Sequence, residues 1–413
     1  MSFGAKKGEN KSKRPANTAF KQQRLRAWQP LLTPKTVLPT FFIIGLILAP
    51  IGGVLYWASD SLFEITLDYT DCKTYSSELT ALPSSKFSLH LGKSFSSKFL
   101  PTAKYDKQSN TCSLQFLIPK DVKAPIYMYY KLTDFYQNHR RYVKSFDQQQ
   151  LSGVARSASD LTGRDCDPLS TRTINGTTKP IYPCGLIANS FFNGKISYYP
   201  NIPPSLLKNS FLFIQICSIY NALDTINDLT LLNPADSSSD SSQVYNLSTN
   251  DIAWESDTYR FGKTSYKNSD VFPPPNWDQR YPYGYTDENP IPDISKDEHL
   301  HVWMRTAGLP TFRKLYGINK IDTLKNGTYQ IDIVMNYDVT TFGGTKSIVI
   351  ATTSAIGGRN PALGIAYISV GVLCVLLGII FTIRHLYRPR RLGDHTYLSW
   401  NQQVQSGLSD PAH

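Results

Sequence analysis

Two long apolar runs stand out in the pattern of hydrophobic and polar positions along this chain. One covers residues 37–58 and the other residues 362–383, and neither contains a charged side chain. As a helix, each run is about 33 Å long at 1.5 Å per residue, which exceeds a bilayer core of roughly 30 Å. Because lipid offers no hydrogen-bond partners to the backbone, both runs are predicted to be transmembrane helices.

Shorter patterns fill the segment between the two runs. Hydrophobic and polar residues alternate in four stretches, as they do in half-buried strands. These stretches are residues 62–69, 112–118, 329–337 and 347–352. Residues 134–144 and 299–316 are predicted to be helical, although Pro310 limits the second helix. The predicted fold class is a membrane protein in which two transmembrane helices enclose one large, mainly β (α+β) ectodomain at residues 59–361.

The formal net charge of +11 is concentrated at the two ends of the chain, which argues against a nucleic-acid-binding surface. The basic residues of the head are Lys6, Lys7, Lys11, Lys13, Arg14, Lys21, Arg24, Arg26 and Lys35. Those of the tail are Arg384, Arg388, Arg390 and Arg391. By the positive-inside rule, the head (1–36) and the tail (384–413) are predicted to be cytoplasmic, and residues 59–361 to lie outside the cytosol. The first run is too long for a cleaved signal peptide and is predicted to be an uncleaved signal anchor.

Cysteines and glycosylation sequons support this topology. Five of the six cysteines lie between the two runs, where oxidation can occur, and Cys374 lies within the second run. Cys217 sits in an apolar run and is expected to be a buried thiol. The simplest pairing of the other four is in sequence order, but the sequence alone leaves their connectivity open. The predicted N-glycosylation sites are Asn175, Asn246 and Asn326.

Small and amphipathic residues near the membrane suggest contact surfaces. Arg24, Arg26 and Trp28 form an amphipathic juxtamembrane piece that is either an interfacial anchor or a protein-docking element. Small residues also recur along both runs, and such stripes let another helix approach closely. These residues are Gly45, Ala49, Gly53, Gly364, Gly371 and Gly378. Two interpretations stay open: the two spans pack on each other, or they pack on a partner with more helices.

Motifs for catalysis or metal binding are few. The sequence contains no phosphate loop, since the residues around Gly343 have the wrong spacing, and no nucleophile elbow, H-E-x-x-H or paired C-x-x-C. His299 and His301 would form a metal site only on a strand with further ligands, and the start of a helix is favoured instead. We therefore predict no catalytic residue, no metal site and no cofactor.

Arg140 and Arg141 are the remaining candidates for binding chemistry. Two adjacent guanidinium groups could bind a phosphate or carboxylate bidentately. The alternative, a structural ion-pair network beside the core, is favoured.

Seven sequence blocks, in order, resemble the β-subunits of eukaryotic phospholipid flippases, the cell-division-control / ligand-effect-modulator family. The blocks are TAFKQQRLRAWQP (18–30), FYQNHRRYV (135–143), IYPCGLIANS (181–190), IAWESD (252–257), VWMRTA (302–307), FGGTKS (342–347) and GGRNP (357–361). Departures are small: residues 236–242 look like a Ser-rich insertion, and Gly308 interrupts a run of small residues.

The resemblance implies a non-catalytic β-subunit that forms a heterodimer with a type IV P-type ATPase. Such a complex moves phosphatidylserine or phosphatidylethanolamine to the cytosolic leaflet, and the β-subunit is needed for exit from the endoplasmic reticulum to the Golgi, endosomes or plasma membrane. The D-K-T-G motif of the ATPase itself is absent from this chain. The resemblance also implies the disulfides Cys72–Cys112 and Cys166–Cys184, N-glycans, spans that approach the pump through their glycine stripes, and docking of Trp28, Arg24 and Arg26 at its cytoplasmic edge.

Two other classes of protein are weaker alternatives. A stand-alone lipid-binding receptor or ectoenzyme would use Arg140, Arg141 and the histidine pair, and would need a pocket with converging titratable groups. An adhesion or cell-surface structural protein would be stable and reach the surface without any partner.

Overall fold

The computed structural model describes residues 16–25, 33–90, 100–191, 225–226, 229–232, 243–278, 280–354 and 357–389. Two compact units divide the chain. One comprises Met1–Tyr56 and Ala362–His413, and the other is the continuous segment Trp57–Pro361. Cys217, Arg26, Trp28 and residues 236–242 lie outside the described residues.

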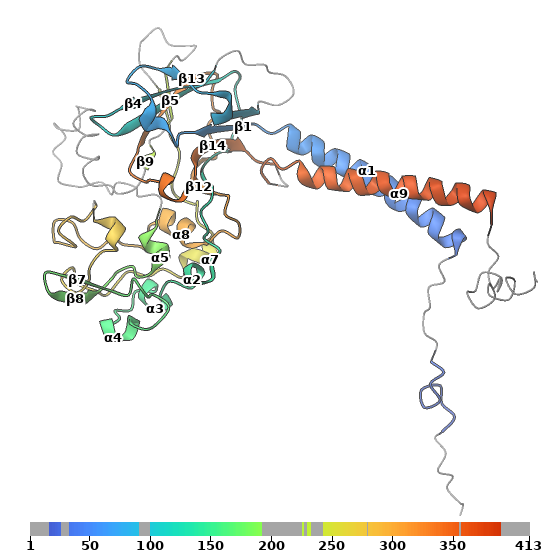
Figure 1. Cartoon of the computed structure of the whole chain (residues 1–413), viewed down its shortest axis with the longest axis horizontal. Helices are drawn as coiled ribbons and strands as arrows, with labels where there is room; N and C mark the ends of the chain where they lie inside the picture. The colour runs from blue at the N-terminus through green and yellow to red at the C-terminus, as the bar shows by residue number, and fades with distance from the viewer. Residues whose placement is uncertain are drawn as a thin grey trace, which may run out of the picture. The chain divides into compact units, whose positions relative to one another are not determined.

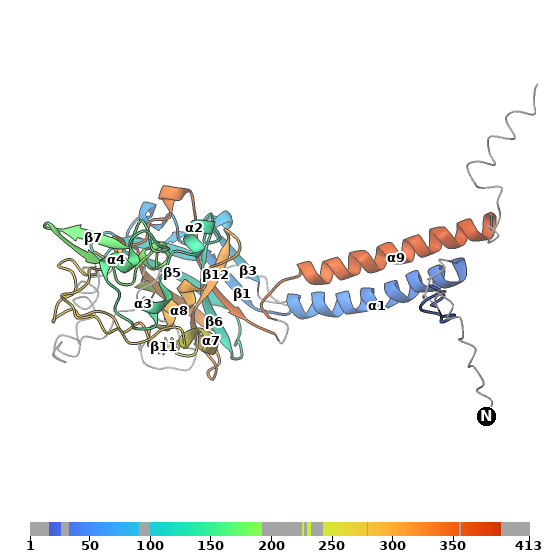
Figure 2. The same ribbon diagram turned by 90° about the horizontal axis from the view of Figure 1, so that it is seen from below.

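The first unit contains the two apolar helices. They are α1 (Pro34–Asp60) and α9 (Ala362–Tyr387), each a few residues longer than the predicted run. By length and composition, both can cross a membrane. Figures 1 and 2 show the two helices side by side.

The second unit, the ectodomain, is built on two antiparallel sheets. In the five-stranded sheet the order is β12 (Phe312–Asn319), β6 (Ile126–Leu132), β14 (Lys346–Thr352), β1 (Glu64–Asp68) and β3 (Phe87–His90). In the seven-stranded sheet it is β11 (Gln243–Tyr245), β10 (Leu229–Leu231), β13 (Gly327–Val334), β5 (Thr111–Ile118), β4 (Thr102–Asp106) and β2 (Thr80–Ala81). The seventh strand of this sheet, β9 (Thr225–Ile226), lies off this order and pairs with β13.

The main apolar core of the ectodomain joins the two sheets. Side chains alternate between buried and half-buried along β6 and β1, as expected for strands with one face on a core. Most buried apolar side chains of both sheets belong to one cluster, which includes Ile65, Met128, Phe116 and Ile331. The mainly β ectodomain predicted from the alternating patterns is therefore confirmed.

The chain enters and leaves the ectodomain at neighbouring strands. β1 pairs with β14 in antiparallel register, with Glu64 opposite Ala351. Phe63 and Thr352 extend this pairing through a backbone hydrogen bond of 3.0 Å. The backbone N–H of Asn360 donates to the Ser59 hydroxyl at 2.9 Å. The two segments that connect to the helices are thus held together within the ectodomain itself.

Between β6 and β12 the chain forms a lobe of short helices and loops, which Figure 1 shows beside the sheets. Its α-helices are α2 (Arg140–Val143), α3 (Gln148–Leu151), α4 (Ala158–Leu161), α5 (Leu186–Asn189), α7 (Glu255–Thr258) and α8 (Glu298–Met304). It also contains the hairpin β7 (Thr171–Ile174) to β8 (Thr177–Pro180). Four 3₁₀ turns complete the described elements: η1 (Cys72–Thr74), η2 (Ser84–Lys86), η3 (Pro275–Trp277) and η4 (Thr340–Phe342).

Both predicted helices of the ectodomain were too long. The helix predicted at 134–144 is reduced to α2, because Asp134 has a positive φ of 55° and His139 is extended. The helix predicted at 299–316 ends with α8, well before Pro310, and the chain continues as β12. Pairing of β12 with β6 prevails over the local helical pattern.

Candidate functional site

The two apolar helices contact each other through glycines. A Cβ placed on Gly52 would lie 2.7 Å from the Ile368 amide and 2.8 Å from the Gly364 carbonyl. At Gly45 it would lie 2.9 Å from the Gly371 carbonyl. Only a residue without a side chain allows such a close approach of two helix backbones.

Glycines of α9 form the other side of this contact. Gly371 lies against Ala49, Gly364 against Tyr56, and Gly378 against the ring of Phe42. Of the two open interpretations, the structure therefore has the spans packed on each other. Gly53 takes no part, since a Cβ there would meet nothing within 4 Å. Its place in the helix pair is taken by Gly52, seven residues after Gly45, which matches the seven-residue spacing of the α9 glycines. The role of these residues, Gly53 included, in contacting a partner subunit stays a prediction.

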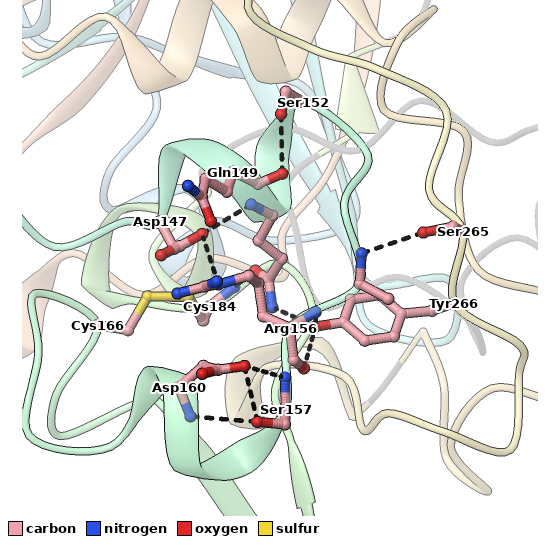
Figure 3. A network of polar contacts seen from close by, with 12 residues as sticks. Asp147, Gln149, Ser152, Arg156, Ser157, Asp160, Cys166, Cys184, Ser265 and Tyr266 are labelled. Carbon is pink, nitrogen blue, oxygen red and sulfur yellow. Dashed lines mark hydrogen bonds and ion pairs between the residues drawn. A yellow bond between two sulfur atoms is a disulfide. The ribbon is translucent and has the colours of Figure 1, made fainter.

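Two disulfides fix the ectodomain, with the connectivity implied by the resemblance. Cys72–Cys112 has a Cα–Cα distance of 6.0 Å and links the turn after β1 to β5, so it ties one sheet to the other. Cys166–Cys184, at 5.7 Å, links the loop after α4 to the start of α5 (Figure 3). Cys374 is the free cysteine among the described residues.

A polar network surrounds the second disulfide (Figure 3). Buried Gln150 donates to the Ile181 carbonyl and accepts from the Cys184 amide, each at 2.9 Å. Asp147 caps α3 by accepting from the Gln150 amide at 2.7 Å. Tyr266 donates to the Arg156 carbonyl at 2.6 Å. Most of these contacts join a side chain to a backbone group, so the network holds loops in place.

Three of the seven sequence blocks that carry the resemblance, residues 135–143, 181–190 and 302–307, meet around Trp303. Its indole nitrogen donates to the Ile187 carbonyl at 2.8 Å, and its ring packs against Phe135 at 5.6 Å between centroids. Gln137, which is fully buried, accepts from the Ala307 amide at 2.9 Å. These blocks therefore build the core of the ectodomain.

Two charged residues, buried Lys314 and half-buried Glu298, were not predicted from the sequence to have a structural role. The Lys314 ammonium donates to the carbonyls of Val302, Trp303 and Arg305, and burial lowers the pKa of Lys314 to about 7. The Glu298 carboxylate accepts the backbone N–H groups of residues 251–253 at 2.8–3.0 Å. The position of Lys314 on the inward face of β12, two residues before buried Tyr316, is a signal that could have revealed it.

His299 and His301 do not converge on one point. Both lie on α8, where a separation of two residues directs side chains to different faces. The ring of His299 lies beside Tyr316, whereas that of His301 stacks on Phe261 with centroids 4.1 Å apart. Nε2 of His301 donates to the Ile294 carbonyl at 2.7 Å. Within the described residues, no group of three or more His, Cys, Asp or Glu is placed to hold a metal ion.

Arg140 and Arg141 are exposed on α2. The favoured ion-pair network is wrong here: neither forms an ion pair within the described part of the chain, because the short helix directs both outward. They line a cavity of about 610 Å³ with His139, Lys144, Gly163, Arg164, Asp165 and Asp167.

The predicted glycosylation sites and juxtamembrane residues are exposed where they are described. Asn175 occupies the turn of the β7–β8 hairpin, and Asn246 and Asn326 are exposed in loops. Arg24 is exposed and contacts Asn17.

Comparison with known proteins places this architecture in a family. The family model described as the LEM3 (ligand-effect modulator 3) family / CDC50 family matches residues 55–391. The chain belongs to the CDC50/LEM3 family. The chain is 39% identical over 402 residues to the phospholipid-transporting ATPase accessory subunit CRF1 of Saccharomyces cerevisiae, covering 96% of this chain and 92% of that protein.

Two further relatives are similar over most of their length. Accessory subunit CDC50 of Chaetomium thermophilum is 38% identical over 409 residues, covering 95% of this chain and 93% of the relative. Cell cycle control protein 50A of Mus musculus is 38% identical over 396 residues, covering 92% of each. The family model begins near the end of α1, whereas the two accessory subunits match at least 95% of this chain, which includes both helices and the ectodomain.

Proposed function

We propose that this chain is the non-catalytic β-subunit and trafficking chaperone of a P-type ATPase phospholipid flippase. The observation that carries the proposal is the similarity, over more than nine-tenths of the chain, to proteins named phospholipid-transporting ATPase accessory subunits. The catalytic partner is a type IV P-type ATPase in a heterodimer, and the complex moves aminophospholipids inward to maintain lipid asymmetry.

The geometry is suited to a subunit that binds a larger membrane protein. The contact between α1 and α9 uses one narrow glycine face of each helix, so most of their apolar side chains face outward, toward lipid or a partner. The ectodomain carries two disulfides and an extensive core, which favour a rigid surface for binding the partner's loops. In this arrangement both termini are cytoplasmic and the ectodomain is lumenal or extracellular. The complex leaves the endoplasmic reticulum for the Golgi, endosomes or plasma membrane.

The three sequon asparagines fit N-glycosylation in that location. Asn175, Asn246 and Asn326 are all exposed, so a transferred glycan would meet no core residue. Digestion of the full chain with an N-glycosidase is expected to lower its apparent mass, and Asn→Gln variants assign the occupied sites.

Lipid uptake in cells that lack the chain tests the proposal. Uptake of fluorescent phosphatidylserine is expected to fall, and the ATPase catalytic subunit to remain in the endoplasmic reticulum. Re-expression of the full chain restores both. Normal uptake together with normal ATPase trafficking in the deleted cells would contradict the proposal.

A further inference from the structure

The ectodomain has a basic cavity that the accessory-subunit function does not explain. It lies between α2 and the loop of residues 163–167 and has a volume of about 610 Å³. Its lining residues are His139, Arg140, Arg141, Lys144, Gly163, Arg164, Asp165 and Asp167. A volume of several hundred Å³ is typical of sites for small molecules.

The backbone on both sides of this cavity is held in place. Next to α2, a Cβ on Gly185 would collide with the Ser145 carbonyl, so the chain after Cys184 packs directly on the end of this segment. The opposite loop is tied to the same place by the Cys166–Cys184 disulfide. Asp167 braces that loop by accepting from the Gly163 amide at 2.6 Å. The charged side chains thus project from a preorganised frame.

The charges in the cavity are unbalanced. The cationic side chains are Arg140, Arg141, Lys144 and Arg164, and none of them has an ion-pair partner in the part of the chain that the structure describes. The two carboxylates are Asp165 and Asp167, and Asp167 is already engaged by the Gly163 amide and the Ser170 hydroxyl. With four cations and two carboxylates, the lining carries a formal charge of +2. Like charges brought together repel each other, and the fold does not need them, since neighbouring Tyr142 supplies the packing.

This charge and chemistry favour a phosphate group over a carboxylate. A guanidinium group matches phosphate with two parallel hydrogen bonds, and lysine adds a compact charge. A phosphomonoester carries about −1.5 to −2 at neutral pH, which balances the lining, whereas a carboxylate or phosphodiester carries a single charge. We propose that the cavity binds a phosphomonoester through Arg140, Arg141, Lys144 and Arg164. The group comes either from a soluble phosphorylated molecule or from a lipid such as phosphatidic acid.

Titration of the full chain in phosphatidylcholine nanodiscs tests this site. Binding of the soluble probes, inorganic phosphate and glycerol 3-phosphate, is measured by calorimetry. Binding to the lipid probe, a phosphatidylcholine vesicle with or without phosphatidic acid, is measured by co-flotation. Arg140→Gln/Arg141→Gln is expected to weaken binding at least about tenfold, because both lost groups make charge-assisted hydrogen bonds. The matched control, Lys296→Gln/Lys320→Gln, removes two exposed charges elsewhere and leaves binding unchanged.

Each outcome of the experiment decides the proposal. Binding of the soluble probes, or flotation that requires phosphatidic acid, supports it if the double variant loses the effect, and the two arms distinguish the sources. Absence of binding by every probe, or equal binding by the double variant and wild type, overturns it. Thermal unfolding of the variant checks its fold, and Lys144→Gln is the second variant if that fold is impaired.

The site is independent of the proposed function. The Arg140→Gln/Arg141→Gln variant should still co-purify with the ATPase catalytic subunit. If it loses that subunit while the control keeps it, and still binds the probes as wild type does, the cavity binds the protein partner instead. That result would overturn the phosphomonoester site and leave the accessory-subunit function intact.

Discussion

Buried and half-buried polar side chains of the ectodomain bind backbone groups of distant segments. Gln150 bridges the Ile181 carbonyl and the Cys184 amide, and Glu298 accepts the N–H groups of residues 251–253. A buried polar group is stable only when it is hydrogen-bonded, so each of these residues fixes a loop that has no regular structure of its own. Such residues explain how a lobe of very short helices keeps one conformation.

His301 gives the ectodomain a pH-dependent stability. Burial lowers the pKa of His301 below its usual value of 6.5, so the folded protein holds the ring neutral. The unfolded chain takes up this proton as the pH falls through about 6.5, and the stabilisation present above that pH is then lost. The midpoint temperature of thermal unfolding of the full chain is expected to be lower at pH 5.5 than at pH 7.5. His301→Gln should be less stable at pH 7.5 but should show a smaller fall.

Exposed His139 provides the control for this experiment. His139→Gln should keep the wild-type fall in midpoint, measured by tryptophan fluorescence. An equal fall in His301→Gln and wild type would mean that His301 does not carry the effect.

At the scale of elements, two kinds of contact hold the chain together: the glycine seam of the helices and the disulfides of the ectodomain. The seam uses Gly45 and Gly52 of α1, seven residues apart, against glycines of α9 with the same spacing. A seven-residue repeat keeps one face of a helix toward its partner over several turns. Each helix therefore has one face for the other helix and the remaining faces for lipid or a partner subunit.

Adjacent glycines allow a matched test of the seam. Gly52→Leu is expected to separate the helices, because its Cβ would meet backbone atoms of Ile368 and Gly364 that cannot move aside. Gly53→Leu is tolerated, since nothing lies within 4 Å. The measurement is oxidative cross-linking between Phe41→Cys and Phe381→Cys, whose native rings lie 5.7 Å apart, in a Cys374→Ser background. Equal cross-linking in both leucine variants would contradict the seam.

Loss of the Cys72–Cys112 disulfide should destabilise the ectodomain and block trafficking. This bond ties the two sheets across 40 residues, and removing such a bond costs roughly 2–5 kcal/mol. Cys72→Ser should therefore unfold at a lower temperature and be retained in the endoplasmic reticulum with its ATPase. The measurement is the maturation state of its glycans, which stay immature when the chain is retained in the endoplasmic reticulum. A Cys72→Ser variant with mature glycans and normal pairing would show the bond to be dispensable.

At the scale of the whole molecule, the arrangement along the chain could be predicted and the long-range contacts could not. The apolar runs and the alternation at 62–69 and 347–352 predicted α1, α9, β1 and β14, since these signals are local. The strand β12 was missed, because its pairing with β6 joins segments almost 190 residues apart along the chain. The basic cavity was missed for the same reason: Arg164 lies more than 20 residues after Arg140 and Arg141 along the chain and joins them in one lining only in the folded chain.

Association with an ATPase is the central claim about the whole molecule. The direct measurement is affinity purification of the full chain in mild detergent through a tag at the C-terminus, with mass spectrometry of the proteins that co-purify. The account predicts a large P-type ATPase in stoichiometric amount, together with the chain in its glycosylated form. A monodisperse chain that has left the endoplasmic reticulum, carries mature glycans and brings no ATPase with it would contradict the account.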